Sequence, residues 1–478
     1  MSAFPVARPA RVRPVIRVDA GPEFIDVPAS LAPADGDVLG HVLFALKHEG
    51  TDLAVLAEVL PRIAAETLAA ALNRTPGGKY LRLVGYLWEQ FTGRRLDGIG
   101  PLSGAVVPVF DPRRYVTGPS FRCPRWRVAF NGLGSMAWCA TVRRTAAIER
   151  GLADDVLARA NRFAAEVDRP MLDRALSWAY LGETRASFEI EHESPPPDKA
   201  RAFVDLLRHA HRRQPLSEDY LAALQSATVS NPFDRAAAFR HEQNWLSSGA
   251  AGAMGVSYLP PPPDQVAELM DGLMRFANVI ARDCDPMVAA ACVSFGFVFI
   301  HPFMDGNGRL SRFLFHHALC HSGRLADGLI LPVSIAMAQH EAEYLAALQS
   351  FSHPARERWD VRMIDVDNYA FEFRGRPSIY RYWDATLCVE FGLRMAEAAL
   401  VQGLHAQVVF ARRYDRIVRR IDAEFDIRNS VLSTLVVSCL EQGRVSRRRR
   451  DQFAGAVPAE AFDAIERAAI EAMAEIDE

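Results

Sequence analysis

Residues 301–312, His-Pro-Phe-Met-Asp-Gly-Asn-Gly-Arg-Leu-Ser-Arg, hold the side chains of this sequence that are best suited to chemistry. His301 is the only group in this stretch that accepts a proton near neutral pH. Asp305 offers the hard carboxylate oxygens that Mg²⁺ prefers. Arg309 and Arg312 are three residues apart, on one face of a helix, and guanidinium groups bind phosphate in a planar, two-pronged geometry. Together these residue types predict a site for a nucleotide polyphosphate beside a base.

Two apolar runs, 287–300 and 310–319, flank this stretch and predict a helix on each side of it. The polar residues then gather in the loop between the helices. Gly306 and Gly308 allow tight or left-handed backbone conformations, so successive N–H groups can form an anion-binding concavity. We expect Asn307 to help shape this turn. The second helix presents the positive end of its dipole to the same place.

The stretch resembles the loop of the Fic (filamentation induced by cAMP) proteins, which reads His-Pro-Phe-x-Asp/Glu-Gly-Asn-Gly-Arg-x-x-Arg. Every fixed position is matched here. The resemblance implies a mainly α-helical bundle with a β-hairpin flap. It also implies a protein adenylyltransferase, which transfers AMP from ATP, with Mg²⁺, to a Ser, Thr or Tyr hydroxyl of a target protein. His301 would be the catalytic base and Asp305 the metal ligand. The nucleotide would be bound by Gly306, Asn307, Gly308, Arg309 and Arg312.

A second motif lies upstream, in a helix predicted over 171–191 after Pro170. Ser187 and Glu191 are four residues apart and share one helix face. Many Fic proteins have a Ser/Thr-x-x-x-Glu helix whose glutamate pairs with the second arginine of the loop. By this resemblance Glu191 would pair with Arg312, block the γ-phosphate and inhibit the enzyme. The family usually has Gly or Asn after this glutamate, where this chain has His192.

A predicted β-hairpin connects the two motifs. Residues 240–246 and 256–258 are expected to form its strands, on either side of a glycine-containing segment. In Fic proteins a hairpin flap at this place pairs with an extended segment of the target protein. We therefore expect Arg240, Gln243 and Trp245 to belong to a target-docking flap.

Composition places further bounds on the function. With 478 residues, half of them hydrophobic, the chain should form two or three globular domains. The net charge of −3 gives no general attraction to nucleic acid or to a membrane, and we expect neither as a partner. Seven scattered cysteines without a Cys-x-x-Cys pair indicate free thiols in a reducing compartment. We expect a cytoplasmic protein without a membrane span, and a homodimer stays open.

Four segments are expected from the patterns along the chain. Residues 1–19 are predicted to be a disordered tail, and 20–168 an N-terminal accessory domain of mixed structure. This domain should contain one helix over 39–72 and β-rich pieces over 104–141. Residues 169–355 would be the Fic domain with its inhibitory helix, and 356–478 a C-terminal domain that is helical to its end.

Three other functions stay open at this point. The same loop with the nucleotide reversed would transfer a phosphate or another phosphate-containing group. With Glu191 positioning a water molecule, the site would remove AMP from a modified protein. The chain could also be a regulator with a silent nucleotide site, which binds DNA or a partner through the helices near the four arginines at 447–450. Arg312 favours AMP transfer, because adenylyl-transferring members of the family have this arginine.

Overall fold

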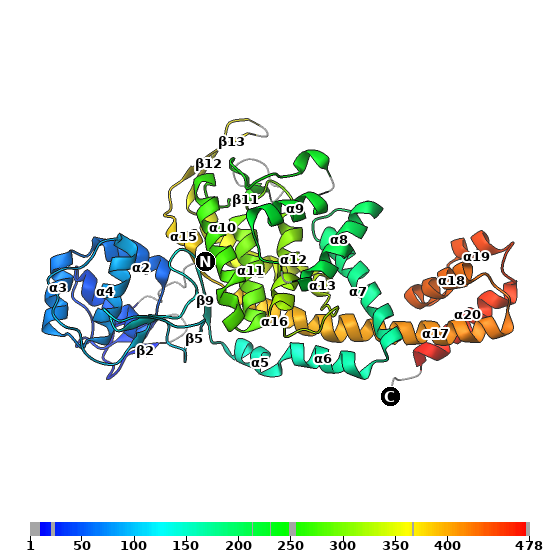
Figure 1. Cartoon of the computed structure of the whole chain (residues 1–478), viewed down its shortest axis with the longest axis horizontal. Coiled ribbons are helices and arrows are strands. Elements are labelled where there is room, and N and C mark those ends of the chain that lie inside the picture. Colours follow the sequence, from blue (N-terminus) through cyan, green and yellow to red (C-terminus); the bar gives the residue numbers. More distant parts are fainter. Residues whose placement is uncertain are drawn as a thin grey trace.

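The computed structural model describes residues 10–20, 24–212, 214–229, 231–247, 255–365 and 368–474. The molecule is mainly α-helical, as predicted, and its overall shape is elongated. An N-terminal unit lies at one end, a large helical bundle in the middle and a small helical bundle at the other end (Figure 1). Each of these parts has its own hydrophobic core. None of the helices within the described residues is long and apolar enough to cross a membrane. All seven cysteines are free thiols.

The N-terminal unit, residues 10–143, combines helices with short strands. Its elements are β1 (Ala10–Val12), β2 (Asp19–Ala20), β3 (Ile25–Val27), α1 (Val38–His48), α2 (Leu53–Val59), α3 (Ala65–Arg74), α4 (Lys79–Thr92), β4 (Val107–Pro108), β5 (Tyr115–Val116), β6 (Phe121–Cys123), β7 (Val128–Phe130), β8 (Leu133–Gly134) and β9 (Cys139–Arg143). The helix predicted over 39–72 is broken into three. Asp37 and Asp52 each start a new helix, because their carboxylates accept N–H bonds from Gly40 and Val55.

The predicted tail differs from the structure where residues are described. Residues 1–9 lie outside the described residues. From Ala10 onward the chain is in part ordered as strands, since β1 pairs in parallel with β3 and β2 pairs antiparallel with it. The prediction of a disordered tail is therefore wrong for residues 10–12 and 19.

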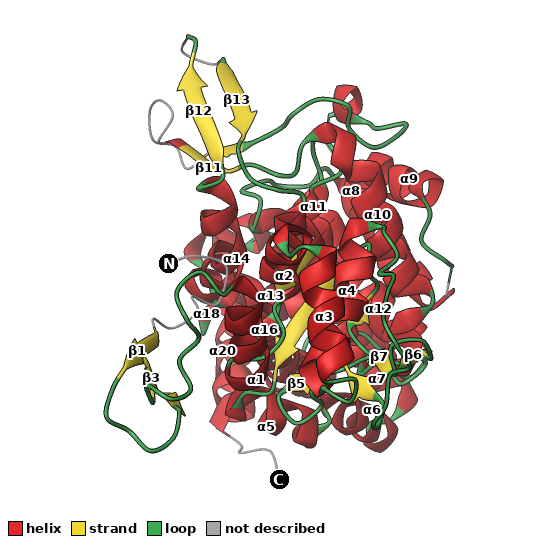
Figure 2. Ribbon diagram, turned by 90° about the vertical axis from the view of Figure 1, so that its left-hand side faces the viewer, coloured by secondary structure: helices red, strands yellow, loops and turns green. Residues whose placement is uncertain are grey.

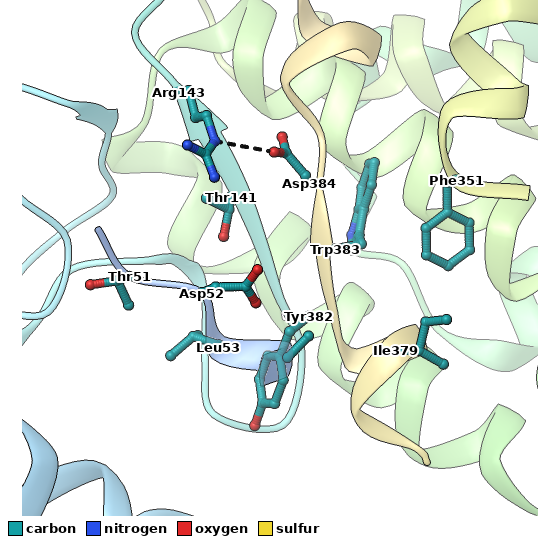
Figure 3. Close-up of a pocket in the computed structure, with 11 residues that line it drawn as sticks. Thr51, Asp52, Leu53, Thr141, Arg143, Phe351, Ile379, Tyr382, Trp383 and Asp384 are labelled. Carbon is teal, nitrogen blue, oxygen red and sulfur yellow. Dashed lines mark hydrogen bonds and ion pairs between the residues drawn. The ribbon is translucent and has the colours of Figure 1, made fainter. Parts of the chain in front are cut away.

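A parallel strand pair joins the N-terminal unit to a distant part of the chain. β14 (Tyr382–Asp384) lies beside β9. Arg143 Nε is 3.4 Å from Asp384 Oδ2, and Figure 3 shows this ion pair in a small pocket that Asp52 also lines. Burial raises the pKa of the Asp52 carboxyl. The chain beyond residue 351 is thus not helical to its end, contrary to the prediction.

The central bundle surrounds α11, an apolar helix that is buried on almost all sides. Its helices are α5 (Ala146–Asp154), α6 (Val156–Glu166), α7 (Arg169–Glu189), α8 (Pro197–His209), α9 (Glu218–Thr228), α10 (Pro263–Asn278), α11 (Pro286–Ile300), α12 (Asn307–His321), α13 (Val333–Gln339), α14 (Glu341–Arg356), α15 (Ser378–Arg381) and α16 (Thr386–Ala398). α12 follows α11 directly and packs along it (Figure 1). The short loop between these two helices, residues 301–306, is called the His301 loop below.

Two β-hairpins lie close to each other at one end of the central bundle. β10 (Leu246–Ser247) pairs antiparallel with β11 (Val256–Tyr258), and β12 (Trp359–Met363) pairs antiparallel with β13 (Tyr369–Phe373). Figure 2 shows β12 and β13 extending outward beside β11. The second hairpin is another departure from the all-helical prediction. Aromatic side chains connect the two hairpins, for example Trp245 and Tyr369, whose ring centroids are 5.0 Å apart.

The C-terminal bundle has a core of its own and is joined to the central bundle by a long helical rod. α16 continues through a π-helical segment, Ala399–His405, into α17 (Figure 1). The remaining helices are α17 (Ala406–Glu424), α18 (Asn429–Gln442), α19 (Arg447–Phe453) and α20 (Ala459–Ala474). α17 also packs against the first half of α7, where Arg174 Nη1 donates to Asp415 at 2.5 and 2.6 Å. α7 thus extends from the C-terminal bundle to the His301 loop.

Candidate active site

The His301 loop has the predicted form of a polar turn between two helices. α11 ends at Ile300, and His301 takes the left-handed conformation with a φ of 52°. Gly306 is also left-handed, with a φ of 84°, and α12 begins directly after it. Phe303 is fully buried, and its backbone N–H and carbonyl both bond the side chain of Asn307, at 3.0 and 2.8 Å. Asn307 therefore shapes the turn in the way that the sequence suggests.

The imidazole of His301 is held as a neutral base. Its Nδ1 lies 3.0 Å from the carbonyl oxygen of Val298. A carbonyl can only accept, so Nδ1 carries the proton and Nε2 keeps its lone pair. Burial lowers the pKa of His301 to about 4, and the positive charge of Arg240 acts in the same direction. The Val298 carbonyl and the carboxylates of Glu191 and Asp305 raise this pKa, but burial outweighs them.

The predicted ion pair between Glu191 and Arg312 is present, and it joins the turn after α7 to α12. Arg312 Nη2 donates to Glu191 Oε1 at 2.8 Å, and Arg312 Nε donates to Ser187 Oγ at 2.9 Å. Arg312 is only 1% exposed, whereas Glu191 is 34% exposed at its side chain. Loss of hydration raises the pKa of Glu191, but attraction to Arg312 outweighs this and the net pKa is below its usual value. The carboxylate is therefore charged at neutral pH.

The Glu191 carboxylate also lies directly over the glycine turn. A Cβ added at Gly308 would collide with this carboxylate. α7 itself ends at Glu189, and His192 takes a left-handed conformation with a φ of 56°. This is the position where the family usually has Gly or Asn, so the backbone turn is kept despite the different side chain. Glu191 thus occupies the place where an anion would meet the start of α12.

A second carboxylate, which the sequence analysis missed, holds the other arginine of the motif. Glu193 Oε2 accepts from Arg309 Nη1 at 2.7 Å, and Arg309 Nη2 also donates to both oxygens of Asp305, at 3.0 and 3.1 Å. The only signal in the sequence is the spacing Glu-His-Glu at 191–193. Both arginines of the loop motif are therefore occupied by glutamates from one short turn after α7.

The two arginines still have unused hydrogen-bonding capacity. Nε of Arg309 and Nη1 of Arg312 are buried and have no hydrogen-bond partner within the described part of the chain. The hydroxyl of Tyr344, on α14, also interacts with the Arg312 guanidinium. Buried donors without partners are costly unless a ligand satisfies them. An oxygen-rich anion fits this donor set.

Asp305 is a suitable single ligand for Mg²⁺. Its side chain is 41% exposed, and one of its oxygens already accepts the Gly306 N–H at 2.6 Å. In the described ranges, no group of three or more His, Cys, Asp or Glu side chains is arranged to hold a metal ion. Mg²⁺ bound with nucleotides needs only one or two carboxylates, because phosphates and water complete its shell. The residues present thus fit a metal that arrives with a polyphosphate.

The predicted hairpin exists, but two of its three expected docking residues face inward. β11 spans the predicted residues, whereas β10 is much shorter than the predicted strand over 240–246, and residues 248–254 lie outside the described residues. Arg240 is 5% exposed and its guanidinium bonds backbone carbonyls, and the Gln243 side chain bonds the carbonyls of Asn244 and Pro260. Trp245 packs on the second hairpin. The Arg240 guanidinium is therefore not available for target docking, because its donors are bonded within the protein. The docking roles of Gln243 and Trp245 stay a prediction, and Gln243 Oε1 is buried without a hydrogen-bond partner among the described residues.

Comparison with known proteins places this site in a family. Residues 215–319 match the family model described as Fic/DOC family. This segment contains the whole His301 loop and nearly all of α12. The chain contains a Fic/DOC domain.

Curated relatives of the Fic domain match over a short stretch. Protein adenylyltransferase fic-1 of Caenorhabditis elegans is 34% identical over 92 residues, which are 19% of this chain and 17% of that protein. Protein adenylyltransferase Fic of Drosophila melanogaster is 39% identical over 67 residues, 14% of each chain. The chain thus covers less than a fifth of the length of the curated relatives that it matches.

Solved structures of Fic proteins are also similar. A Fic domain containing signaling protein from Bacteroides thetaiotaomicron has a TM-score of 0.40 and 17% identity, over 56% of this chain and 97% of that chain. A Fic family protein from Desulfovibrio desulfuricans has a TM-score of 0.40 and 19% identity, over 69% and 90%. At these scores the family assignment depends on the sequence match and the His301 loop.

Proposed function

We propose that this protein is an adenylyltransferase that moves AMP from ATP to a Ser, Thr or Tyr hydroxyl of a target protein. The observation that carries the proposal is the neutral imidazole of His301 next to the positive start of α12, with two buried arginines in the following turn. This combination of base and polyanion site suits a nucleophilic attack on phosphorus. The relatives that match over a short stretch are named protein adenylyltransferases, which supports the same reaction.

In the proposed step, Nε2 of His301 takes the proton of the acceptor hydroxyl. The hydroxyl oxygen forms a bond with the α-phosphorus of ATP, and the bond from that phosphorus to the bridging oxygen of the β-phosphate breaks. Pyrophosphate leaves with the electron pair. The backbone N–H groups at the start of α12, together with Arg309 and Arg312, would neutralise the phosphate charge. Mg²⁺ on Asp305 would supply further charge neutralisation and orientation of the phosphates.

The described conformation would be a resting state of this enzyme. Glu191 binds Arg312, the guanidinium that would hold the γ-phosphate, and its carboxylate lies over Gly308. A carboxylate and a phosphate cannot share this place, because both are negative. Displacement of Glu191 would therefore come before productive binding of ATP.

Transfer of label from ATP tests the proposal. Purified wild type, Glu191→Gly and Glu191→Gly/His301→Ala proteins would each be incubated with lysate and ATP that carries ³²P at the α-position. We expect protein-bound label with Glu191→Gly, less with wild type and a loss of label with the double variant. Equal labelling by Glu191→Gly and the double variant would contradict the role of His301.

A parallel reaction with γ-labelled ATP separates the alternatives. Label from the γ-position on protein would indicate phosphate transfer, which the proposal does not allow. Loss of AMP from a previously adenylylated protein on incubation with wild type, but not with Glu191→Gly, would indicate the reverse reaction. In that case Glu191 would position water instead of blocking ATP.

A further inference from the structure

Arg240 is a buried cation that is bonded only to backbone carbonyl oxygens among the described residues. Its Nε donates to the backbone carbonyl of His301 at 2.8 Å, its Nη1 to the backbone carbonyl of Glu242 at 3.0 Å, and its Nη2 to the backbone carbonyl of Pro261 at 2.6 Å. No carboxylate in the described ranges neutralises it, and burial lowers the pKa of Arg240 to about 10. A buried charge without a counter-ion is costly, so it is kept where its charge or its geometry is needed.

The segment that begins at Arg240 bonds three successive carbonyls of the His301 loop. The Arg240 side chain donates to the carbonyl of His301. The Arg240 backbone N–H donates to the carbonyl of Pro302 at 2.8 Å, and Asn244 Nδ2 donates to the carbonyl of Phe303 at 2.8 Å. The first of these bonds fixes the peptide plane of His301. A left-handed backbone is unfavourable for a residue with a side chain and persists only where its surroundings hold it.

The Arg240 charge acts on the imidazole as well as on the backbone. The charged groups that act on the ring are Arg240, Glu191 and Asp305; Arg240 favours its neutral form, and the two carboxylates favour its protonated form. Tyr258 and Tyr380 face Arg240 and stay protonated at neutral pH, because burial raises the pKa of each phenol. At neutral pH the charge of Arg240 is therefore not cancelled locally.

We propose that Arg240 is a positioning residue of the transfer reaction: it fixes the backbone that aims the imidazole of His301 and keeps a positive charge beside the ring. The expected effect of Arg240 on kcat rests on the proposed function. The expected effect of Arg240 on the titration of the His301 ring does not depend on any activity, so the inference and the proposed function can fail separately.

The test uses Arg240→Met, which removes charge and donors, and Arg240→Lys, which keeps the charge but lacks the planar fork. Both changes are made in the full chain with Glu191→Gly. Arg235→Met is the matched control, because Arg235 is an exposed arginine shortly before Arg240 in the chain. Folding is checked by thermal unfolding. The His301 ring is titrated by NMR, with its signal assigned from the His301→Ala spectrum, and kcat and the Kd for ATP are measured separately.

We expect Arg240→Met to raise the pKa of His301 and to lower kcat on the order of 10²-fold, as expected for a displaced reacting group, with the Kd for ATP unchanged. Arg240→Lys should keep the parent titration and still lose kcat, and Arg235→Met should match the parent in both. A folded Arg240→Met protein with the parent titration and kcat would overturn the proposal. If Arg240→Met does not fold, Arg240→Lys decides, and a parent kcat for that variant would overturn it. If the Glu191→Gly parent transfers no AMP, the proposed function fails and the titration alone tests Arg240.

Discussion

Two buried arginines, Arg240 beside the His301 loop and Arg312 within α12, are bonded in different ways. Arg240 is held by three backbone carbonyl oxygens, one of them in the His301 loop, and these cannot move away without a change in the backbone itself. Arg312 is held by Ser187 and by a partly exposed glutamate in the turn after α7. The first arginine is a permanent part of the loop, whereas the second can exchange one anion for another. The same type of side chain thus serves as a fixed support at position 240 and as an exchangeable ligand site at position 312.

The largest effect is expected from substitution of His301. In the Glu191→Gly background, His301→Ala should lower kcat by about 10²–10⁴-fold, the usual contribution of a general base. The Kd for ATP, measured by calorimetry, should stay the same, because the arginines and the start of α12 are intact. Full activity of the double variant, or loss of ATP binding together with activity, would contradict the assigned role.

Removal of the exchangeable anion should have the next largest effect. Glu191→Gly should tighten ATP binding and raise the transfer rate, by roughly 5–150-fold if the coupling has the usual size. Glu189→Gly is the matched control, since Glu189 is an exposed glutamate at the end of α7, shortly before Glu191. An equal response to both changes would mean that helix fraying, and not the lost ion pair, explains the result.

A smaller effect is expected at the second glutamate. Glu193→Gln, added to Glu191→Gly, should raise the affinity for ATP by at most about 5-fold, because a partly exposed ion pair contributes roughly 1 kcal/mol or less. Asp305 continues to hold Arg309 in this variant. Titration with ATP by calorimetry would measure the difference, and weaker binding would show that Glu193 orders the site instead of obstructing it.

The smallest effect is expected from mild acid. The pKa of His301 is lowered to about 4, so the ring stays neutral and able to accept a proton as the pH falls from 7 toward 5. Loss of the Glu191 charge lowers this pKa further, since that carboxylate favours the protonated ring. The kcat/KM of Glu191→Gly should therefore change little over this range and fall only at about pH 4 or below. A midpoint near 6.5, the ordinary value for histidine, would contradict the account.

The sequence was informative where function depends on residues close together in the chain. The loop between α11 and α12 follows from glycines between two apolar runs. The pair of Glu191 and Arg312 was expected from the resemblance of two linear motifs to those of Fic proteins. These motifs say nothing about Glu193, whose position depends on the turn made by His192 after α7 ends. A carboxylate four residues beyond a helix end can point in many directions until the backbone turn is known.

Contacts between distant segments could not be predicted from local patterns. Nothing in residues 240–246 indicates that Arg240 bonds the loop about 60 residues later. Its place in a predicted hairpin that resembles the flap of Fic proteins suggested a docking role instead. Likewise, β14 is too short for its pattern to identify it, and it is a strand because β9 offers a free edge. Such features depend on which surfaces meet, and a single sequence does not reveal this.

A crystal structure of the Glu191→Gly protein with a non-hydrolysable ATP analogue and Mg²⁺ would test the central claim most directly. The account predicts that the triphosphate lies at the start of α12, with its γ-phosphate on Arg312 and its α-phosphorus facing Nε2 of His301. It would be contradicted by a nucleotide bound elsewhere, or by a triphosphate in this place whose α-phosphorus faces away from His301.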